Sequence, residues 1–308
     1  MENKAIALTG NLIESAKMIE IRRMTIDDVQ LGLKLTRQAG WNQTESDWLR
    51  FIKLEPEGCF VAELGGRSVG TTTTCVFDRI AWIAMVLVDV NARGKGVGTE
   101  LLKYSLNYLE AGKVRTVRLD ATSVGQPIYE KLGFVPEYQL ARFACRDLAS
   151  PSEPRREGIA PSGRRRPAVT KATPEIFASI IEFDKWMTGT NRAKMLSRLF
   201  EEFPEDIHAL WHGDKIEGFI VTRPGANAIH IGPCVATIDA GSALLSDALN
   251  RCAAESVFID IPLDNADAVR VAESSALRIQ RYFMRMSRGE RVKDNIKALW
   301  ASSGPEKG

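Results

Sequence analysis

Six residues in the first third of the chain combine types and spacing that suit the binding of an anion. Residues 93–98 read RGKGVG, with a glycine at every second position and two basic side chains among them. The apolar run before them, at 81–89, predicts a buried strand, and leucines at helical spacing predict a helix over 99–111. The first N–H groups of a helix lack intrahelical partners, and glycine lets a phosphate approach them. The segment therefore predicts a phosphate or pyrophosphate site.

Two familiar nucleotide-binding motifs do not fit this segment. A Walker P-loop requires G-x-x-x-x-G-K-S/T, but Asp89 stands at its first glycine and Gly96 at its Ser/Thr. A dinucleotide fingerprint requires G-x-G-x-x-G, and its third glycine falls on Thr99. The pattern that remains is R-x-x-G-x-G, carried by Arg93, Gly96 and Gly98.

The elements that must hold this segment alternate between strands and helices, and part of their order occurs twice. Hydrophobic periodicity and turn residues predict strands at 19–23, 59–64, 67–77, 81–89, 114–121 and 138–145, with helices at 25–39, 44–53, 99–111 and 125–133. Further along, they predict strands at 207–211, 215–224, 228–236, 256–262 and 278–286, with helices at 239–254 and 265–276. The repeated order of strand, helix and strand predicts two halves of one fold.

A second motif, IYEKLGF at 128–134, lies about 30 residues after the glycine segment. Together the two motifs resemble the GCN5-related N-acetyltransferases (GNAT), which carry Q/R-x-x-G-x-G/A after their fourth strand and YExxGF on a later helix. The resemblance covers about 18–145. It implies an α/β fold of two tandem GNAT-like domains, each with a mixed, mostly antiparallel central sheet flanked by helices.

The resemblance and the shifts in composition along the chain predict four parts. We expect an N-terminal tail at 1–17, a catalytic GNAT domain at 18–145, a Pro- and Arg-rich linker at 146–170, and a degenerate GNAT-like domain at 171–308. In the last part only Gly241 remains near the corresponding turn, and Arg93 and Lys95 have no basic counterpart. We therefore expect the second half not to bind CoA in the usual way.

The resemblance implies direct acetyl transfer from acetyl-CoA to an amine, without a metal. Tyr129 matches the family tyrosine near the CoA sulfur and is the expected acid, although a packing role fits it too. Asp120, at a strand end, is the first choice of general base, and a structural aspartate is the alternative. Thr122 stands where many members carry Asn. The expected cofactor-binding residues are Val86, Leu87, Val88, Arg93, Gly94, Lys95, Gly96, Val97, Gly98, Thr99 and Thr122.

The candidates for the acceptor site lie between the first two helices and on the central strand. Trp41, Asn42 and Asp47 belong to the stretch GWNQTESDW, where the resemblance places the acceptor wall, and Trp82 lies on the strand before the glycine segment. Such side chains would bind a polar or cationic small molecule. Core packing is the alternative for both tryptophans.

Charge and composition narrow the classes of function. A net charge of +2 is too small to predict a nucleic-acid partner, and its basic excess lies in 146–170. The sequence has no membrane-spanning apolar run and no secretory signal, which predicts a cytoplasmic protein without a membrane partner. Five scattered cysteines predict neither disulfides nor a metal site. We expect a monomer or weak dimer that acetylates a small-molecule amine; a noncatalytic acyl-CoA-binding or sensor protein and a protein acetyltransferase are the alternatives.

Overall fold

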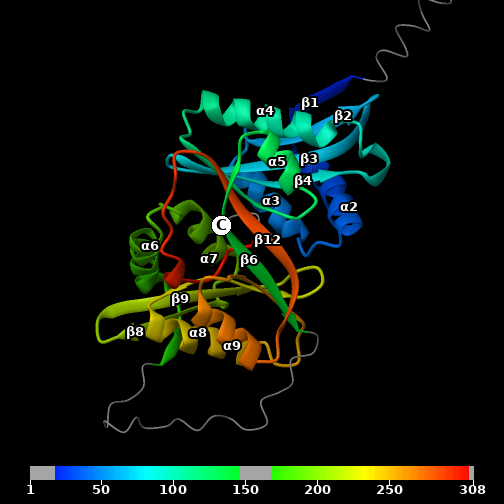
Figure 1. Ribbon diagram of the computed structural model, residues 1–308. Helices are drawn as coiled ribbons and strands as arrows, with labels where there is room; N and C mark the ends of the chain where they lie inside the picture. The colour runs from blue at the N-terminus through cyan, green and yellow to red at the C-terminus, as the bar shows by residue number, and fades with distance from the viewer. Residues whose placement is uncertain (1–17, 146–167, 305–308) are drawn as a thin grey trace, which may run out of the picture. The chain divides into compact units, whose positions relative to one another are not determined.

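The computed structural model describes residues 18–145 and 168–304, and the chain divides into two compact units, 1–117 and 118–308 (Figure 1). The predicted tail at 1–17 and most of the predicted linker, 146–167, lie outside the described residues. The last residues counted with the linker, Val169 and Thr170, belong to a short strand, β7 (Val169–Lys171).

The first unit contains an antiparallel sheet in the order β1-β2-β3-β4. Its strands are β1 (Ile19–Arg23), β2 (Cys59–Leu64), β3 (Arg67–Phe77) and β4 (Ile80–Val88). Its helices are η1 (Ile26–Asp28), α2 (Val29–Ala39), α3 (Glu45–Leu54), η2 (Val90–Ala92) and α4 (Val97–Ala111). These elements match the predicted ones closely.

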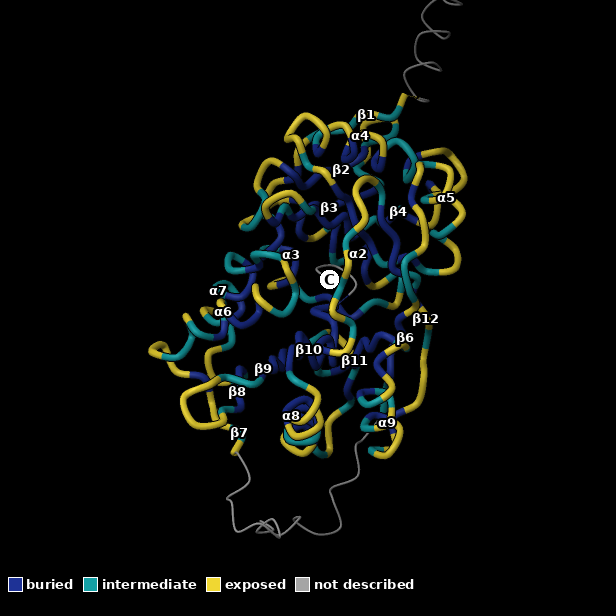
Figure 2. Tube along the Cα trace, turned by 60° about the vertical axis from the view of Figure 1, so that its left-hand side comes forward, coloured by how far each residue is buried: buried dark blue, intermediate teal, exposed yellow. Residues whose placement is uncertain are grey.

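The alternation of side chains along β2 assigns the helices to the two faces of this sheet. Cys59 and Val61 pack in a buried cluster with residues of α2 and α3. Phe60 and Ala62 pack instead with Leu101 of α4. Because successive strand residues point to opposite faces, α2 and α3 cover one face and α4 covers the other. Figure 2 shows β3 as a largely buried strand.

The second unit has a sheet in the order β12-β6-β11-β10-β9-β8-β7, and β13 pairs with β10. β5 (Thr116–Ala121) begins in the first unit and ends in the second, where β12 is its neighbour. β10 and β11 are parallel, whereas β6–β11, β6–β12, β9–β10, β10–β13, β8–β9 and β7–β8 are antiparallel. The remaining strands are β6 (Val135–Cys145), β8 (Ile207–His212), β9 (Lys215–Arg223), β10 (Ile229–Ala236), β11 (Val257–Pro262), β12 (Arg278–Gly289) and β13 (Leu299–Ala301).

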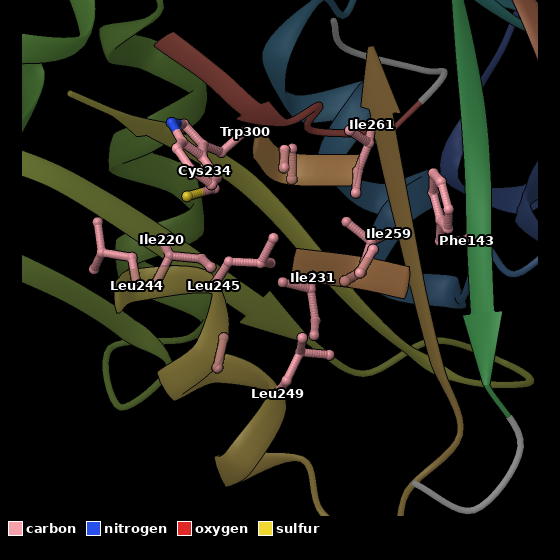
Figure 3. Packing of buried hydrophobic residues seen from close by; sticks show 14 of the residues in the cluster. Phe143, Ile220, Ile231, Cys234, Leu244, Leu245, Leu249, Ile259, Ile261 and Trp300 are labelled. Carbon is pink, nitrogen blue, oxygen red and sulfur yellow. The ribbon is translucent and has the colours of Figure 1, made fainter. Parts of the chain in front are cut away.

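The helices of the second unit are α5 (Gln126–Lys131), α6 (Pro174–Thr188), α7 (Ala193–Glu202), α8 (Ile238–Arg251), α9 (Ala266–Ser274) and η3 (Ile296–Ala298). Side chains of α8 and α9 form a buried cluster with residues of β6, β9, β10 and β11 (Figure 3). Phe143, Ile231 and Ile259 lie in this cluster, and Trp300 of β13 belongs to it as well. Within the described residues, no helix is both long and apolar enough to cross a membrane.

The pairing of β6 differs from the order that the sequence suggests. We expected β6 to be the last strand of the first domain, but it lies between β11 and β12 (Figure 2). Ala141, for example, stands opposite Ile261 on one side and Tyr282 on the other. Both edges of β6 therefore bond to strands of the second half, which explains why the boundary between the compact units falls near Val117.

Candidate active site

A bulge interrupts β4 just before the glycine segment. The register between β3 and β4 shifts between Thr71 and Thr73, which leaves Met85 and Val86 facing a single residue of β3. Met85 has a φ of 50°, a left-handed value that few non-glycine residues adopt. Its carbonyl accepts a hydrogen bond from Thr71 Oγ1 at 2.9 Å. Because a bulge redirects the backbone, it changes the orientation of the strand at Val86, where the predicted thioester contacts begin.

Asp89 ties the end of β4 to η2 and to α2. Its carboxylate accepts hydrogen bonds from the Asn91 backbone N–H at 3.0 Å and from Gln38 Nε2 at 3.4 Å, and Lys34 Nζ lies 2.7 Å away. The Lys34 ammonium and the Asn91 N–H lower the pKa of Asp89 to about 2. This aspartate is therefore ionised at neutral pH and fixes the start of the loop.

The glycines of the loop are required by backbone conformation rather than by space. Gly94 and Gly96 have φ values of 74° and 85°, in the left-handed region. A Cβ atom added at either position would meet no atom within 4 Å. Gly96 is the N-cap of α4, and no side chain caps the helix there. The first-turn N–H groups, from Val97 to Thr99, are therefore free of a side-chain cap.

Two basic side chains border this uncapped helix end. Arg93 Nε donates to Val88 O at 3.2 Å, and Lys95 Nζ donates to Asn91 O at 3.1 Å. Both residues are exposed, as are Gly94 and Gly96. Positive charge and oriented N–H groups at the N-terminus of a 15-residue helix are the features that bind a phosphate.

Tyr129 lies on α5 with its ring between a glycine and a phenylalanine. A Cβ on Gly125 would approach Tyr129 Cε2 to 2.9 Å, and the Phe134 ring meets the Tyr129 ring edge-on at a centroid distance of 5.9 Å. Burial raises the pKa of Tyr129 to about 12, because it penalises the phenolate. The hydroxyl has no hydrogen-bond partner among the described residues, and it is a neutral donor at physiological pH.

Thr122 holds the turn that leads from β5 to this helix. Its carbonyl accepts from the N–H groups of Gly125 and Gln126, both at 3.0 Å. Its hydroxyl accepts a longer bond from Gly125 N at 3.3 Å. The hydroxyl thus helps to shape the turn before Tyr129.

Asp120 is engaged in a buried ion pair. Arg285 of β12 donates to its two carboxylate oxygens at 2.8 and 2.9 Å, and each side chain is only 2% exposed. Burial raises the pKa of Asp120, while the Arg285 guanidinium opposes that shift. Arg285 also donates to the hydroxyl of Tyr138 at 2.8 Å, and that hydroxyl donates to Asp294. This arrangement favours the structural alternative for Asp120, and its role as a base stays a prediction.

The four candidate acceptor residues lie in the first unit, and three of them are buried. Asp47 caps α3 by accepting from Thr44 N at 2.9 Å, and its other oxygen accepts from Arg50 at 2.6 Å. Asn42 is 5% exposed and Trp82 is 4% exposed. Trp41 is half-buried and packs against the cluster formed with α2 and α3. Their role in acceptor binding stays a prediction.

The predicted site residues are divided between the two compact units. The residues of β4 and of the glycine loop belong to the first unit, and so do the candidate acceptor residues. Asp120, Thr122 and Tyr129 belong to the second unit.

Two family models match the chain, and both describe an acetyltransferase (GNAT) domain. One matches residues 55–136 and the other matches residues 180–301. The chain belongs to the GNAT family. It is a tandem GNAT acetyltransferase, with one domain in each half of the sequence.

Curated relatives of this GNAT protein are acyltransferases. Holothin acyltransferase of a Pseudoalteromonas species is 25% identical over 63% of this chain, and the match spans 61% of that protein's length. The uncharacterized N-acetyltransferase YitH of Bacillus subtilis is 22% identical over 80% of this chain and 83% of its own. N-alpha-acetyltransferase 30 of Xenopus laevis is 34% identical, over 30% of this chain and 37% of its own.

Solved structures show the same fold across nearly the whole chain. A Pyrococcus horikoshii protein assigned to the acetyltransferases superposes with a TM-score of 0.75 at 24% identity and covers 94% of this chain and 96% of its own. A tandem GNAT protein from the clavulanic acid biosynthesis pathway gives a TM-score of 0.61 at 15% identity and covers 90% of this chain and 100% of its own. The GNAT fold therefore extends through both halves.

Three residues that contact or orient the predicted site residues were not among the sequence predictions. Met85 forms the bulge, Asp89 fixes the loop, and Arg285 pairs with Asp120. Asp89 is the polar last residue of the predicted strand, which was a usable signal, whereas nothing local marks Met85 or Arg285. Among the described residues, no group of three or more His, Cys, Asp or Glu side chains is arranged to hold a metal ion.

Proposed function

We propose that this GNAT acetyltransferase uses acetyl-CoA and transfers the acetyl group directly to the amine of a small metabolite. The observation that carries the proposal is the uncapped N-terminus of α4, with Gly94 and Gly96 in left-handed conformations beside Arg93 and Lys95. These features suit the pyrophosphate of CoA, since they combine oriented N–H groups with positive charge. The expected thioester contacts are the backbone groups of 86–88.

Tyr129 supplies a proton in this proposal. Attack of a neutral amine on the thioester carbonyl forms the C–N bond, and collapse of the intermediate breaks the C–S bond, so a thiolate leaves. The nitrogen releases one proton to water as the amide forms, which balances the proton that Tyr129 gives to the thiolate and then regains from solvent. The Tyr129 phenol is neutral, because burial raises its pKa to about 12, and it can donate to that thiolate. The amine reaches the site uncharged, or its ammonium form first loses a proton to water or to a carboxylate. Asp120 is the predicted carboxylate for this role.

The direct test is the release of thiol from acetyl-CoA across a panel of amines. We expect turnover with at least one compact amine and none without an acceptor. Tight binding of acetyl-CoA without turnover on any amine would favour the noncatalytic acyl-CoA-binding protein instead.

Replacing Tyr129 tests its role as the acid. Tyr129→Phe keeps the ring packed between Gly125 and Phe134 and removes only the hydroxyl. We expect kcat to fall by about 10²- to 10⁴-fold, the usual share of acid–base catalysis, with little change in the KM for acetyl-CoA. Tyr282→Phe is the matched control, because Tyr282 is exposed on β12. An unchanged kcat would remove Tyr129 from the mechanism.

A second acceptor class follows from the relatives. N-alpha-acetyltransferase 30, by its name, acts on an alpha-amino group. Its matched region is 34% identical, compared with 25% for holothin acyltransferase and 22% for YitH. The panel should therefore include amino acids and short peptides with free alpha-amines beside compact amines. Faster turnover with peptides than with any free amine would favour the protein acetyltransferase.

A further inference from the structure

The second GNAT domain has a strand bulge like that of the first, and its C-terminal segment fills the place beside it. The register between β10 and β9 shifts between Ile231 and Cys234, just as the register of β4 shifts at Met85. β10 pairs with β11 only as far as Ile231, which stands opposite Ile259. Beyond that point the edge of β10 pairs with β13 instead.

The backbone of residues 296–304, which we call the C-terminal segment, bonds to both strands. Ala301 and Leu299 pair with Cys234 and Val235 of β10. The next N–H, of Ser302, donates to the carbonyl of Asp260 on β11 at 2.8 Å. The segment therefore lies between β10 and β11, where the two strands separate.

One side chain of the same domain holds the segment through three carbonyls. Asn265 Nδ2 donates to the carbonyl oxygens of Ile296, Lys297 and Leu299, at 3.3, 3.4 and 3.0 Å. Asn265 Oδ1 accepts from Ala268 N at 3.2 Å and so caps α9. Asn265 Nδ2 therefore contacts the C-terminal segment and Asn265 Oδ1 contacts α9, so a substitution can remove one contact and keep the other.

Two glycines make room for the segment. A Cβ at Gly232 would lie 2.1 Å from the carbonyl oxygen of Ser302, and a Cβ at Gly241 would lie 1.9 Å from Trp300 Cε2. Trp300 is 1% exposed and fills the space beside α8 (Figure 3). The N-terminus of α8 is capped by Thr237, whose hydroxyl accepts from Ala240 N at 3.4 Å. The start of α8 is therefore capped by a side chain, whereas the start of α4 is not.

We propose that the gap between β10 and β11 is a binding site for an extended, amide-bearing chain, the chemical class of a pantetheine arm, and that the C-terminal segment occupies it in cis. The proposal deepens the proposed function and rests on it, because it assigns the single acetyl-CoA of each chain to the first domain. Gly232, Gly241 and Asn265 are the residues that adapt the second domain to its own tail.

Replacing Asn265 tests whether the segment is held as a ligand. Asn265→Asp keeps the oxygen that caps α9 and removes the donor to the three carbonyls. We expect amide hydrogen exchange of 299–304 to accelerate about tenfold or more, through local opening of the segment. Asn191→Asp is the matched control, since Asn191 Oδ1 accepts from Ala193 N at 3.1 Å at the start of α7. The control should leave exchange of the segment unchanged.

Replacing Gly232 provides an independent route if the first variant does not fold. Gly232→Ala places a methyl group against the Ser302 carbonyl at a φ of 142°, whereas Gly213→Ala adds a methyl group at a φ of 60°, with no atom within 4 Å. We expect faster exchange of 299–304 only in the first of these. Unchanged exchange in both Asn265→Asp and Gly232→Ala would overturn the proposal.

Native mass spectrometry then measures occupancy. We expect one acetyl-CoA on the intact chain, and an additional pantetheine adduct on Asn265→Asp that Asn191→Asp lacks. Two acetyl-CoA molecules on the intact chain, or no additional pantetheine on the opened variant, would contradict the proposal. Absence of any acetyl-CoA binding would instead refute the proposed function, while the exchange data would still report on the segment.

Discussion

At the scale of residues, the glycines of the RGKGVG loop have different tasks. Gly96 needs its left-handed φ of 85°, whereas Gly98 lies within α4, and a Cβ there would make an ordinary contact of 3.6 Å with Val88 Cγ2. Gly96→Ala should cost about 1–2 kcal/mol in the conformation that directs the helix N–H groups outward. We expect the KM for acetyl-CoA to rise about tenfold, with kcat nearly unchanged.

Gly98→Ala is the matched comparison for that prediction. Its KM should stay within about twofold of the parent, because alanine is compatible with a helical position. Initial-rate kinetics at varied acetyl-CoA would measure both variants. Equal effects at the two positions would mean that space for the ligand, and not backbone conformation, requires the glycines.

Functional residues can be predicted from the sequence where they form a local motif. They cannot be predicted where their role depends on a partner far away along the chain. The loop glycines and Tyr129 were singled out from spacing and resemblance, and their roles stay predictions; the structure adds the left-handed φ values of Gly94 and Gly96. The pairing of Asp120 with Arg285 was not, because 164 residues separate them along the chain and no local pattern links a strand aspartate to a distant arginine. Asp47 is a different case, because its partner Arg50 lies three residues away and the spacing of Thr44 and Asp47 is a local capping signal.

At the scale of elements, the Asp120–Arg285 pair links β5 to β12. Removing one partner of a buried ion pair leaves the other charge uncompensated, which typically costs about 3–5 kcal/mol. We expect Asp120→Asn to lower the free energy of unfolding by about that amount and to leave kcat within about tenfold of the parent at a temperature where the protein is folded. Chemical denaturation and initial rates would measure the two effects.

The opposite result would restore Asp120 as the general base. In that case Asp120→Asn would remain stable, its kcat would fall by about 10²-fold or more, and the acidic limb of the pH–rate profile would disappear. Asp184→Asn serves as a comparison, because it also weakens a buried pair, with Arg192, but lies on α6 and is not a predicted site residue.

Hydrophobic periodicity identified most elements but not their partners. The strands from β1 to β4 pair in sequence order, as hairpin signals suggest. For β6, alternation indicates a strand with a buried face and says nothing about which edges it will meet. The helices α6 and α7 and the strand β13 were not predicted, and β13 is too short for a periodic signal.

At the scale of the whole molecule, paired carboxylates determine the stability toward acid. The pKa of Asp89 is lowered to about 2 by Lys34 and Asn91. Burial alone would raise the pKa of Asp294, but the hydrogen bond and charge of Arg118 outweigh it and hold the pKa at about 2. Because the folded-state values lie below the unfolded value, this stability is present above about pH 4 and is lost as the pH falls toward 2.

We therefore expect these groups to leave the free energy of unfolding almost constant above about pH 4. Between about pH 4 and pH 2 the free energy of unfolding should decrease. Asp89→Asn should lower stability at neutral pH by about 1 kcal/mol and make the acid loss shallower. Urea denaturation at a series of pH values would measure both. An equally steep loss in the variant would show that other carboxylates govern the acid transition.

The pairing of β6 has a consequence for the synthesis of the protein. β6 ends at Cys145, and its partner β11 begins only at Val257. At about 5–20 residues per second, a ribosome needs roughly ten seconds to produce that partner. During this interval the native partners of both edges of β6 are missing, and unpaired strand edges favour association with other chains. Native pairing of β6 therefore has to wait until the ribosome has produced most of the second half of the chain.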